Sequence, residues 1–144
     1  MRFLLDTSIV SAPIAATPNP AVVAKLQLHG HEACIAAPVW NELLFGCARL
    51  PAGRRRDLLH SYLRDVVEVA FPILPYEAAA AVWHASERSR LERLGRTAPF
   101  VDGQIAAIAH TAGLTLVTVN VRDFKPFAEL EVVDWSRRSS RRNS

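Results

Sequence analysis

Short apolar runs alternate with helical patterns along most of the chain. Three runs read as buried strands: Arg2 to Asp6, ACIAA at 33–37 and LTLVTV at 114–119. Residues 67–74 are expected to form a further strand, and VVD at 132–134 a short edge strand. Because strands separated by helices are joined by right-handed crossovers, the pattern predicts a parallel sheet of four to five strands with helices on both faces.

Proline and glycine mark the ends of the helices between these strands. Pro20 begins a helix that ends at Gly30, and Pro38 begins the next, which is followed by a charged helix through Tyr62. A helix ending at Gly113 precedes the strand at 114–119. The long helix after Pro75 is expected to bury Ala78, Val82, Ala85 and Leu91.

The 144 residues fit one domain over residues 1–135, with a polar Arg/Ser-rich tail at 136–144 that is expected to be disordered. Half the residues are hydrophobic, yet no apolar run is long enough to span a bilayer. The chain enters a strand pattern without a signal-like segment, so we expect a cytoplasmic protein. Two cysteines, Cys34 and Cys47, without metal-ligand spacing argue against a zinc site or a disulfide framework.

The positive net charge of +3 comes from the tail. Residues 1–134 carry 13 Lys and Arg against 14 Asp and Glu, whereas the tail adds four arginines and no acid. The folded part is therefore nearly neutral, and the tail is either a phosphate-contacting segment or a solvated terminus.

Four acidic residues lie at points where the predicted chain changes direction. Three of them could simply cap helices, and the fourth could be a favourable partner of a helix dipole. If the strands are parallel, however, their carboxyl ends meet at one edge of the sheet, where so many ionised carboxylates need a cation between them. The pattern therefore indicates a divalent-metal enzyme that uses Asp6, Glu42, Asp102 and Asp123.

The segments around these acids resemble the four acidic blocks of the PIN-domain ribonucleases, and among them the VapC toxins of bacterial toxin-antitoxin pairs. They are LLDTS at 4–8, NELLFG at 41–46, VDGQIAAIA at 101–109 and LTLVTVNVRDF at 114–124. PNPAVVAKL at 18–26 and the Asp-Gly pair at 102 and 103 are most similar to the FitB branch. Ser8 and Val119 stand where that family often has Asn and Arg.

The resemblance implies a three-layer α/β sandwich and an endoribonuclease that hydrolyses phosphodiester bonds with Mg²⁺ or Mn²⁺. Oxygen-only ligands suit these ions. We assign direct metal contacts to Asp6 and Asp102, with Glu42 and Asp123 completing the site directly or through water. The residues that could orient the carboxylates or hold water, or could be local caps and turn formers, are Thr7, Ser8, Thr118 and Asn120.

The resemblance also implies partners. They are an RNA substrate, a cognate VapB-like antitoxin that inserts into the acidic cleft, and a second copy of the chain in a homodimer. The apolar helices at 20–28 and 39–48 could offer a groove for a partner's helix, although core burial explains the same pattern.

Other function classes fit less well. A response-regulator receiver needs paired acids after the first strand and a late lysine, but Asp6 is single and the only lysines are Lys25 and Lys125. A D-x-D phosphatase would need an acid where Ser8 stands. The stronger alternative is a FitB-like binding protein that acts with a DNA-binding partner in transcriptional regulation and has little or no nuclease activity.

Overall fold

A five-stranded parallel sheet runs through the centre of the molecule, in a computed structural model that describes residues 1–137. The strands are β1 (Phe3–Leu5), β2 (Ala33–Ala36), β3 (Ile73–Leu74), β4 (Thr115–Val117) and β5 (Val132–Val133). Their order is β3-β2-β1-β4-β5, so the chain grows outward in both directions from β1. This confirms the predicted parallel sheet and the short edge strand near residue 132.

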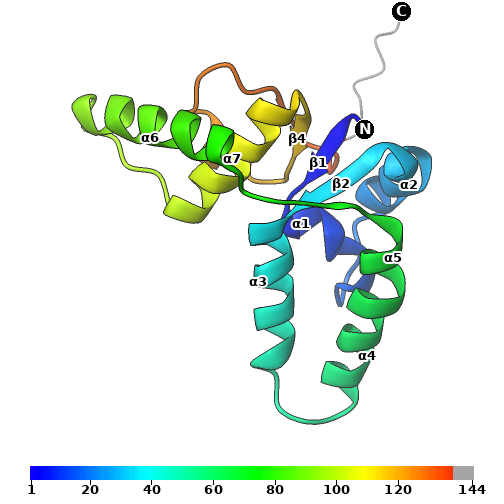
Figure 1. Cartoon of the computed structure of the whole chain (residues 1–144). Coiled ribbons are helices and arrows are strands. Elements are labelled where there is room, and N and C mark those ends of the chain that lie inside the picture. Colours follow the sequence, from blue (N-terminus) through cyan, green and yellow to red (C-terminus); the bar gives the residue numbers. More distant parts are fainter. Residues whose placement is uncertain (138–144) are drawn as a thin grey trace, which may run out of the picture.

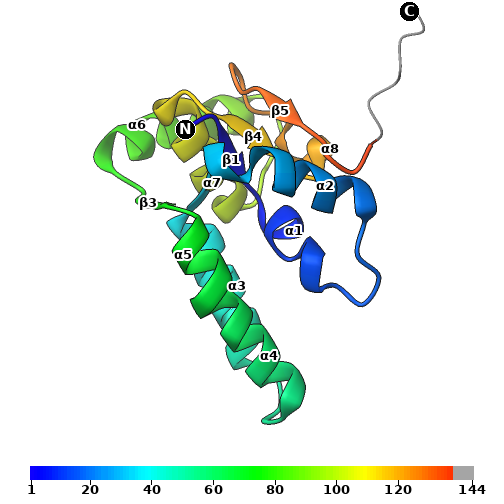
Figure 2. The ribbon, with the colours of Figure 1, turned by 90° about the vertical axis from the view of Figure 1, so that its right-hand side faces the viewer.

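Helices connect every pair of successive strands. Their bounds are α1 (Thr7–Val10), η1 (Ala12–Ile14), α2 (Pro20–His29), η2 (Gly30–Glu32), α3 (Ala37–Ala48), α4 (Arg54–Tyr62), η3 (Leu63–Val67), α5 (Glu68–Ala70), α6 (Ala78–Arg93), α7 (Phe100–Ala112) and α8 (Val121–Phe124). Helix α2 lies on one side of the sheet and α6 and α7 on the other (Figures 1 and 2). Helices α3 and α4 form a hairpin that extends away from the sheet (Figure 1).

The helix ends follow the chemistry that the sequence predicted. The Asn19 side chain accepts hydrogen bonds from the N–H groups of Ala21 (2.9 Å) and Val22 (3.3 Å), directly beside Pro20 in the first turn of α2. Gly113 ends α7 in the left-handed conformation, with φ 68° and ψ 34°. Glycine adopts this backbone without steric strain, which allows α7 to turn directly into β4.

The core is built on the two central strands. Every residue of β1 and β2 is buried, as expected for strands covered on both faces. Helix α7 contributes a run of small apolar residues from Ile105 to Ala109, all of them buried. The three alanines of this run let α7 approach the sheet closely. Asp102 lies in the first turn of the same helix, so the packing of α7 also sets the position of Asp102.

The prediction of a strand over residues 67–74 is wrong for most of that segment. Residues 63–70 are helical, and only Ile73 and Leu74 pair with β2. Leu63 and Val67 are both buried and stand four residues apart, which is the spacing of a helix face. The apolar run was therefore the continuation of the preceding helix, which ends before Pro72.

The inner face of α6 also differs from the prediction. Ala78, Val82 and Ala85 are exposed, whereas Leu91 is buried as expected. The buried positions are Ala80, His84, Glu87 and Leu91. Two of these, His84 and Glu87, are polar side chains with partners in the fold. The apolar pattern therefore predicted the wrong buried face for this helix.

The predicted disordered tail falls mostly on residues 138–144, outside the described residues. Only residues 136 and 137 of the tail are described. The backbone N–H of Ser136 donates to the Asp134 carboxylate at 2.7 Å. Among residues 1–137, no helix has the length and apolar character needed to cross a membrane.

Candidate metal centre

Asp6 stands directly after the central strand β1. Its backbone N–H donates to the Val117 carbonyl (2.9 Å), which extends the pairing of β1 with β4 to this residue. One carboxylate oxygen accepts from the Thr7 N–H at 2.8 Å, and the other accepts from the Thr118 hydroxyl at 2.8 Å. Asp6 therefore caps α1, and its carboxylate is also held from a second strand, which a capping role does not require.

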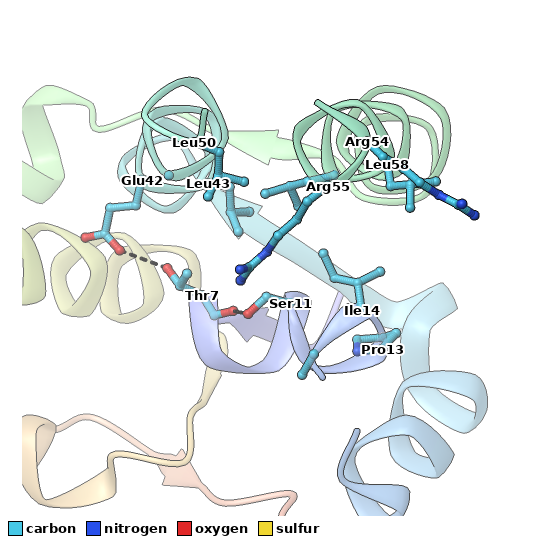
Figure 3. A pocket seen from close by; sticks show the side chains of 13 residues that line it. Thr7, Ser11, Pro13, Ile14, Glu42, Leu43, Leu50, Arg54, Arg55 and Leu58 are labelled. Carbon is cyan, nitrogen blue, oxygen red and sulfur yellow. Dashed lines mark hydrogen bonds between the residues drawn. The ribbon is translucent and has the colours of Figure 1, made fainter. Parts of the chain in front are cut away.

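Glu42 comes from α3, the helix that follows β2. The Thr7 hydroxyl donates to its Oε2 at 2.9 Å (Figure 3). Thr7 therefore contacts two acids, Asp6 through its N–H and Glu42 through its hydroxyl. This single residue fixes the relative positions of carboxylates that are 36 residues apart in the sequence.

Asp102 lies in the first turn of α7, and Asp123 lies in the short helix α8 after β4. The pKa of Asp102 is raised to about 6, first by burial and then by the negative charges of Asp6, Asp123 and Glu42. The negative charges of the other three acids therefore reach Asp102 at this edge of the sheet. That the four acids together form one metal site stays a prediction.

The pKa of Asp6 is also raised, but opposing effects act on it. Burial raises it most, the hydrogen bonds from Thr118 and the Thr7 N–H lower it, and the charge of Asp123 raises it further. The two donors stabilise the ionised form of Asp6. The two hydrogen bonds therefore offset part of the effect of burial on Asp6, whose pKa remains raised overall.

The donor set fits a hard divalent cation. All four groups are carboxylates, and the ions that prefer such ligands are Mg²⁺ and Mn²⁺. Among residues 1–137, no three His, Cys, Asp or Glu side chains are gathered closely enough to form a ready-made metal site. Binding an ion here therefore requires the carboxylate side chains to turn toward it.

The remaining polar residues predicted around the acids make weaker contacts. The Val119 N–H donates to the Ser8 hydroxyl at 3.4 Å, which links α1 to the end of β4. The Asn120 N–H donates to the Thr118 hydroxyl at 3.0 Å and so orients that hydroxyl toward Asp6. Asn120 acts here through its backbone. The side-chain role predicted for it stays a prediction.

A groove of about 1000 Å³ opens beside Glu42. It lies between α1 with η1 on one side and the hairpin of α3 and α4 on the other (Figure 3). Arg55 extends from α4 over this groove in Figure 3. The other residues that line it are Thr7, Ser11, Pro13, Ile14, Ala15, Leu43, Gly46, Leu50, Arg54, Leu58 and Leu59.

Sequence reasoning found only part of this groove. The helix at 39–48 lies in one wall, as suggested, but the opposite wall comes from α1 and η1 and not from the helix at 20–28. Arg54 and Arg55 belong to a run of three arginines in the sequence, a pattern that by itself does not predict a groove.

Comparison with known proteins supports the resemblance found in the sequence. The family model described as "PIN domain" matches residues 3–130. The chain is 34% identical to Toxin FitB of Neisseria gonorrhoeae, with 84% of this chain and 89% of FitB covered. It is 30% identical to the tRNA(fMet)-specific endonuclease VapC of Shigella flexneri, with 94% and 99% covered. The structure of FitAB bound to an IR36 DNA fragment aligns with a TM-score of 0.88 at 28% identity, with 96% of this chain and 99% of that chain covered. The acidic edge of the sheet, the fold and these similarities together show that the chain belongs to the PIN-domain family, among relatives named as VapC and FitB toxins.

Proposed function

We propose that this chain is a divalent-metal-dependent endoribonuclease and the toxin of a toxin-antitoxin pair. The observation that carries the proposal is the joining of Asp6 and Glu42 through Thr7 at the carboxyl edge of a PIN-domain sheet, where burial, their charges and that of Asp123 raise the pKa of Asp102. A purely structural cluster would pair its acids with basic residues. Here the charges that raise the pKa of Asp102 are those of the three other acids.

In this proposal, Asp6 and Asp102 contact the ion, and Glu42 and Asp123 complete its coordination directly or through water. Mg²⁺ or Mn²⁺, when bound, activates a water molecule and offsets charge on the scissile phosphate. Thr118 and the Thr7 N–H orient the Asp6 carboxylate and favour its ionised form against the effect of burial. The Thr7 hydroxyl orients the Glu42 carboxylate.

The test is cleavage of purified RNA by the protein with Mn²⁺ or Mg²⁺, with and without a chelator, followed by mapping of the new ends. We expect cleavage that the chelator stops and that D6N abolishes, because Asn removes the negative charge at nearly the same volume. Intact RNA at saturating Mn²⁺ would contradict a nuclease. It would favour the FitB-like alternative, in which the chain acts with a DNA-binding partner.

We further infer that the partner is a VapB-like antitoxin. Solved structures similar to this chain are complexes: FitAB with a DNA fragment, and VapBC2 of Rickettsia felis with a DNA fragment from its promoter, at TM-scores of 0.88 and 0.81. The groove beside Glu42 has apolar walls and suits an amphipathic segment of a partner. A basic residue of such a segment would pair with the carboxylates.

Co-expression tests this assignment. The exposed groove residue Leu58 offers a surface change, L58E, that leaves the four acids in place. We expect L58E to release the cognate antitoxin while cleavage of RNA persists. Retention of the antitoxin by L58E at wild-type affinity would show that the partner binds elsewhere. Homodimerisation is inferred from the family resemblance alone, and light scattering of the purified chain tests it.

A further inference from the structure

Helix α6 buries two polar side chains, His84 and Glu87. Buried polar groups are stabilised only when they find partners. Glu87 accepts two hydrogen bonds from Arg90, at 2.7 and 2.9 Å, and one from the Ala128 N–H at 2.6 Å. Glu87 therefore anchors the loop after α8 to α6, which accounts for its burial.

His84 has a different environment. Only 2% of it is exposed, and its Nδ1 lies 2.8 Å from the Tyr76 hydroxyl. The opposite edge of the ring faces α7. A Cβ atom built at Gly103 would lie 2.1 Å from His84 Nε2 and 2.6 Å from Cδ2, distances that real Cβ atoms do not reach. The imidazole thus occupies the space that any side chain at position 103 would need.

The same ring contacts the start of α7 a second time. The centroids of the His84 and Phe100 rings are 4.8 Å apart, and the Arg88 guanidinium lies over Phe100 at 4.9 Å. His84 therefore contacts α7 at residues 100 and 103, on either side of Asp102. Tyr76, in the segment before α6, fixes the ring from behind.

Asp102 needs such support because three other acids repel it. Its position is set by the first turn of α7, and that turn rests on the His84 ring. We propose that His84 is a positioning residue, which holds the first turn of α7 so that Asp102 projects into the acidic cluster. The metal-binding and cleavage consequences rest on the proposed function, whereas the effect on the turn does not.

The test compares H84A with a matched core variant, L63A. Leu63 is fully buried in η3, outside the site and the groove, so L63A lowers stability without touching α7. Under conditions where both variants are fully folded, we expect H84A to bind Mn²⁺ about tenfold more weakly than wild type, as when groups that orient metal ligands are removed. L63A is expected to retain wild-type Mn²⁺ affinity, and kcat for RNA cleavage is expected to fall only in H84A.

A compensating change makes the test specific. G103A alone is expected to destabilise the fold and weaken Mn²⁺ binding, because its Cβ meets the His84 ring. In the H84A background the same Cβ enters vacated space, so H84A/G103A is expected to bind Mn²⁺ more tightly than either single variant. An additive loss in the double variant would overturn the proposal.

Hydrogen exchange gives a readout that needs no metal. The Gly103 N–H donates to the Pro99 carbonyl at 3.1 Å and so reports on the first turn of α7. We expect H84A to speed exchange at this amide by about tenfold or more relative to the amide of Ala109, which lies further along α7. Wild-type protection of the Gly103 amide in H84A would overturn the proposal. If wild-type protein binds no Mn²⁺, the metal assignment fails, and this exchange measurement still decides the role of His84.

Discussion

Replacing Thr118 by Val separates the orienting hydrogen bond at Asp6 from the packing around it. Thr118 is fully buried at the end of β4, and its hydroxyl donates to the Asp6 carboxylate at 2.8 Å. Valine has nearly the same shape but no hydroxyl. The Thr118 hydroxyl also accepts a hydrogen bond from the Asn120 N–H. Asn120 is exposed, so in T118V its N–H can bond to water instead.

The expected cost follows from the charge of Asp6. A hydrogen bond to an ionised group contributes about 1.5–3 kcal/mol. Burial of an extra apolar carbon offsets roughly 0.8 kcal/mol of that loss. We therefore expect T118V to lower the free energy of unfolding by about 1–2 kcal/mol at pH 7, measured in chelator.

The pH dependence has a definite sign. Burial already raises the pKa of Asp6 in the folded state above its ordinary value of 3.8, and loss of the Thr118 donor raises it further. An acid whose pKa is higher in the folded than in the unfolded protein lowers the free energy of unfolding as pH rises through the folded pKa. This loss is absent below the unfolded pKa. The deficit of T118V should therefore shrink as pH falls toward 3.8.

Urea denaturation of wild type, T118V and T118S at neutral and acidic pH tests this. T118S keeps the hydroxyl and loses a buried methyl, so we expect it to cost about 1 kcal/mol at both pH values. An equal loss for T118V at both pH values, or none at pH 7, would refute the electrostatic role of this hydrogen bond.

Three further predictions concern other parts of the fold. D102N is expected to raise the stability of the metal-free protein at pH 7 by about 1 kcal/mol, after allowance for screening at this half-buried site. Because the folded pKa of Asp102 is about 6 against an ordinary 3.8, the gain should disappear below pH 3.8, and a gain that persists there in urea denaturation would contradict the repulsion. E87Q is expected to cost about 1 kcal/mol at pH 7. Its deficit should fall as pH drops below the ordinary value of 4.5, because the hydrogen bonds from Arg90 lower the pKa of Glu87 in the folded state; a pH-independent deficit in thermal scans would count against this pairing. Y62F is expected to cost about 0.5–1.5 kcal/mol, because the Tyr62 hydroxyl donates to the Val10 carbonyl at 2.6 Å and ties α4 to α1. An unchanged midpoint in urea would show that this contact between α4 and α1 contributes nothing.

The sheet and the acids could be predicted because local rules determine them. Fully buried strands such as Phe3–Leu5 and Ala33–Ala36 read as short apolar runs, and the second lies between Gly30 and Pro38. Parallel pairing then brings Asp6 and Asp123 to one edge without any knowledge of side-chain contacts.

The errors arose where tertiary contacts decide the outcome. The run from Val67 to Leu74 suits a strand by composition, but contacts with the core extend the preceding helix through its first residues. His84 and Glu87 are polar, yet Tyr76 and Arg90 satisfy them inside the fold. The groove depends on the angle between helices, which no local pattern encodes.

The central claim is that four carboxylates from separate chain segments form one divalent-metal site. Calorimetric titration of the chelator-treated protein with Mn²⁺ tests it most directly, with D102N as the matched variant. We predict saturable Mn²⁺ binding by the wild-type protein and its loss in D102N. No binding to wild type, or equal binding to both proteins, would contradict the claim.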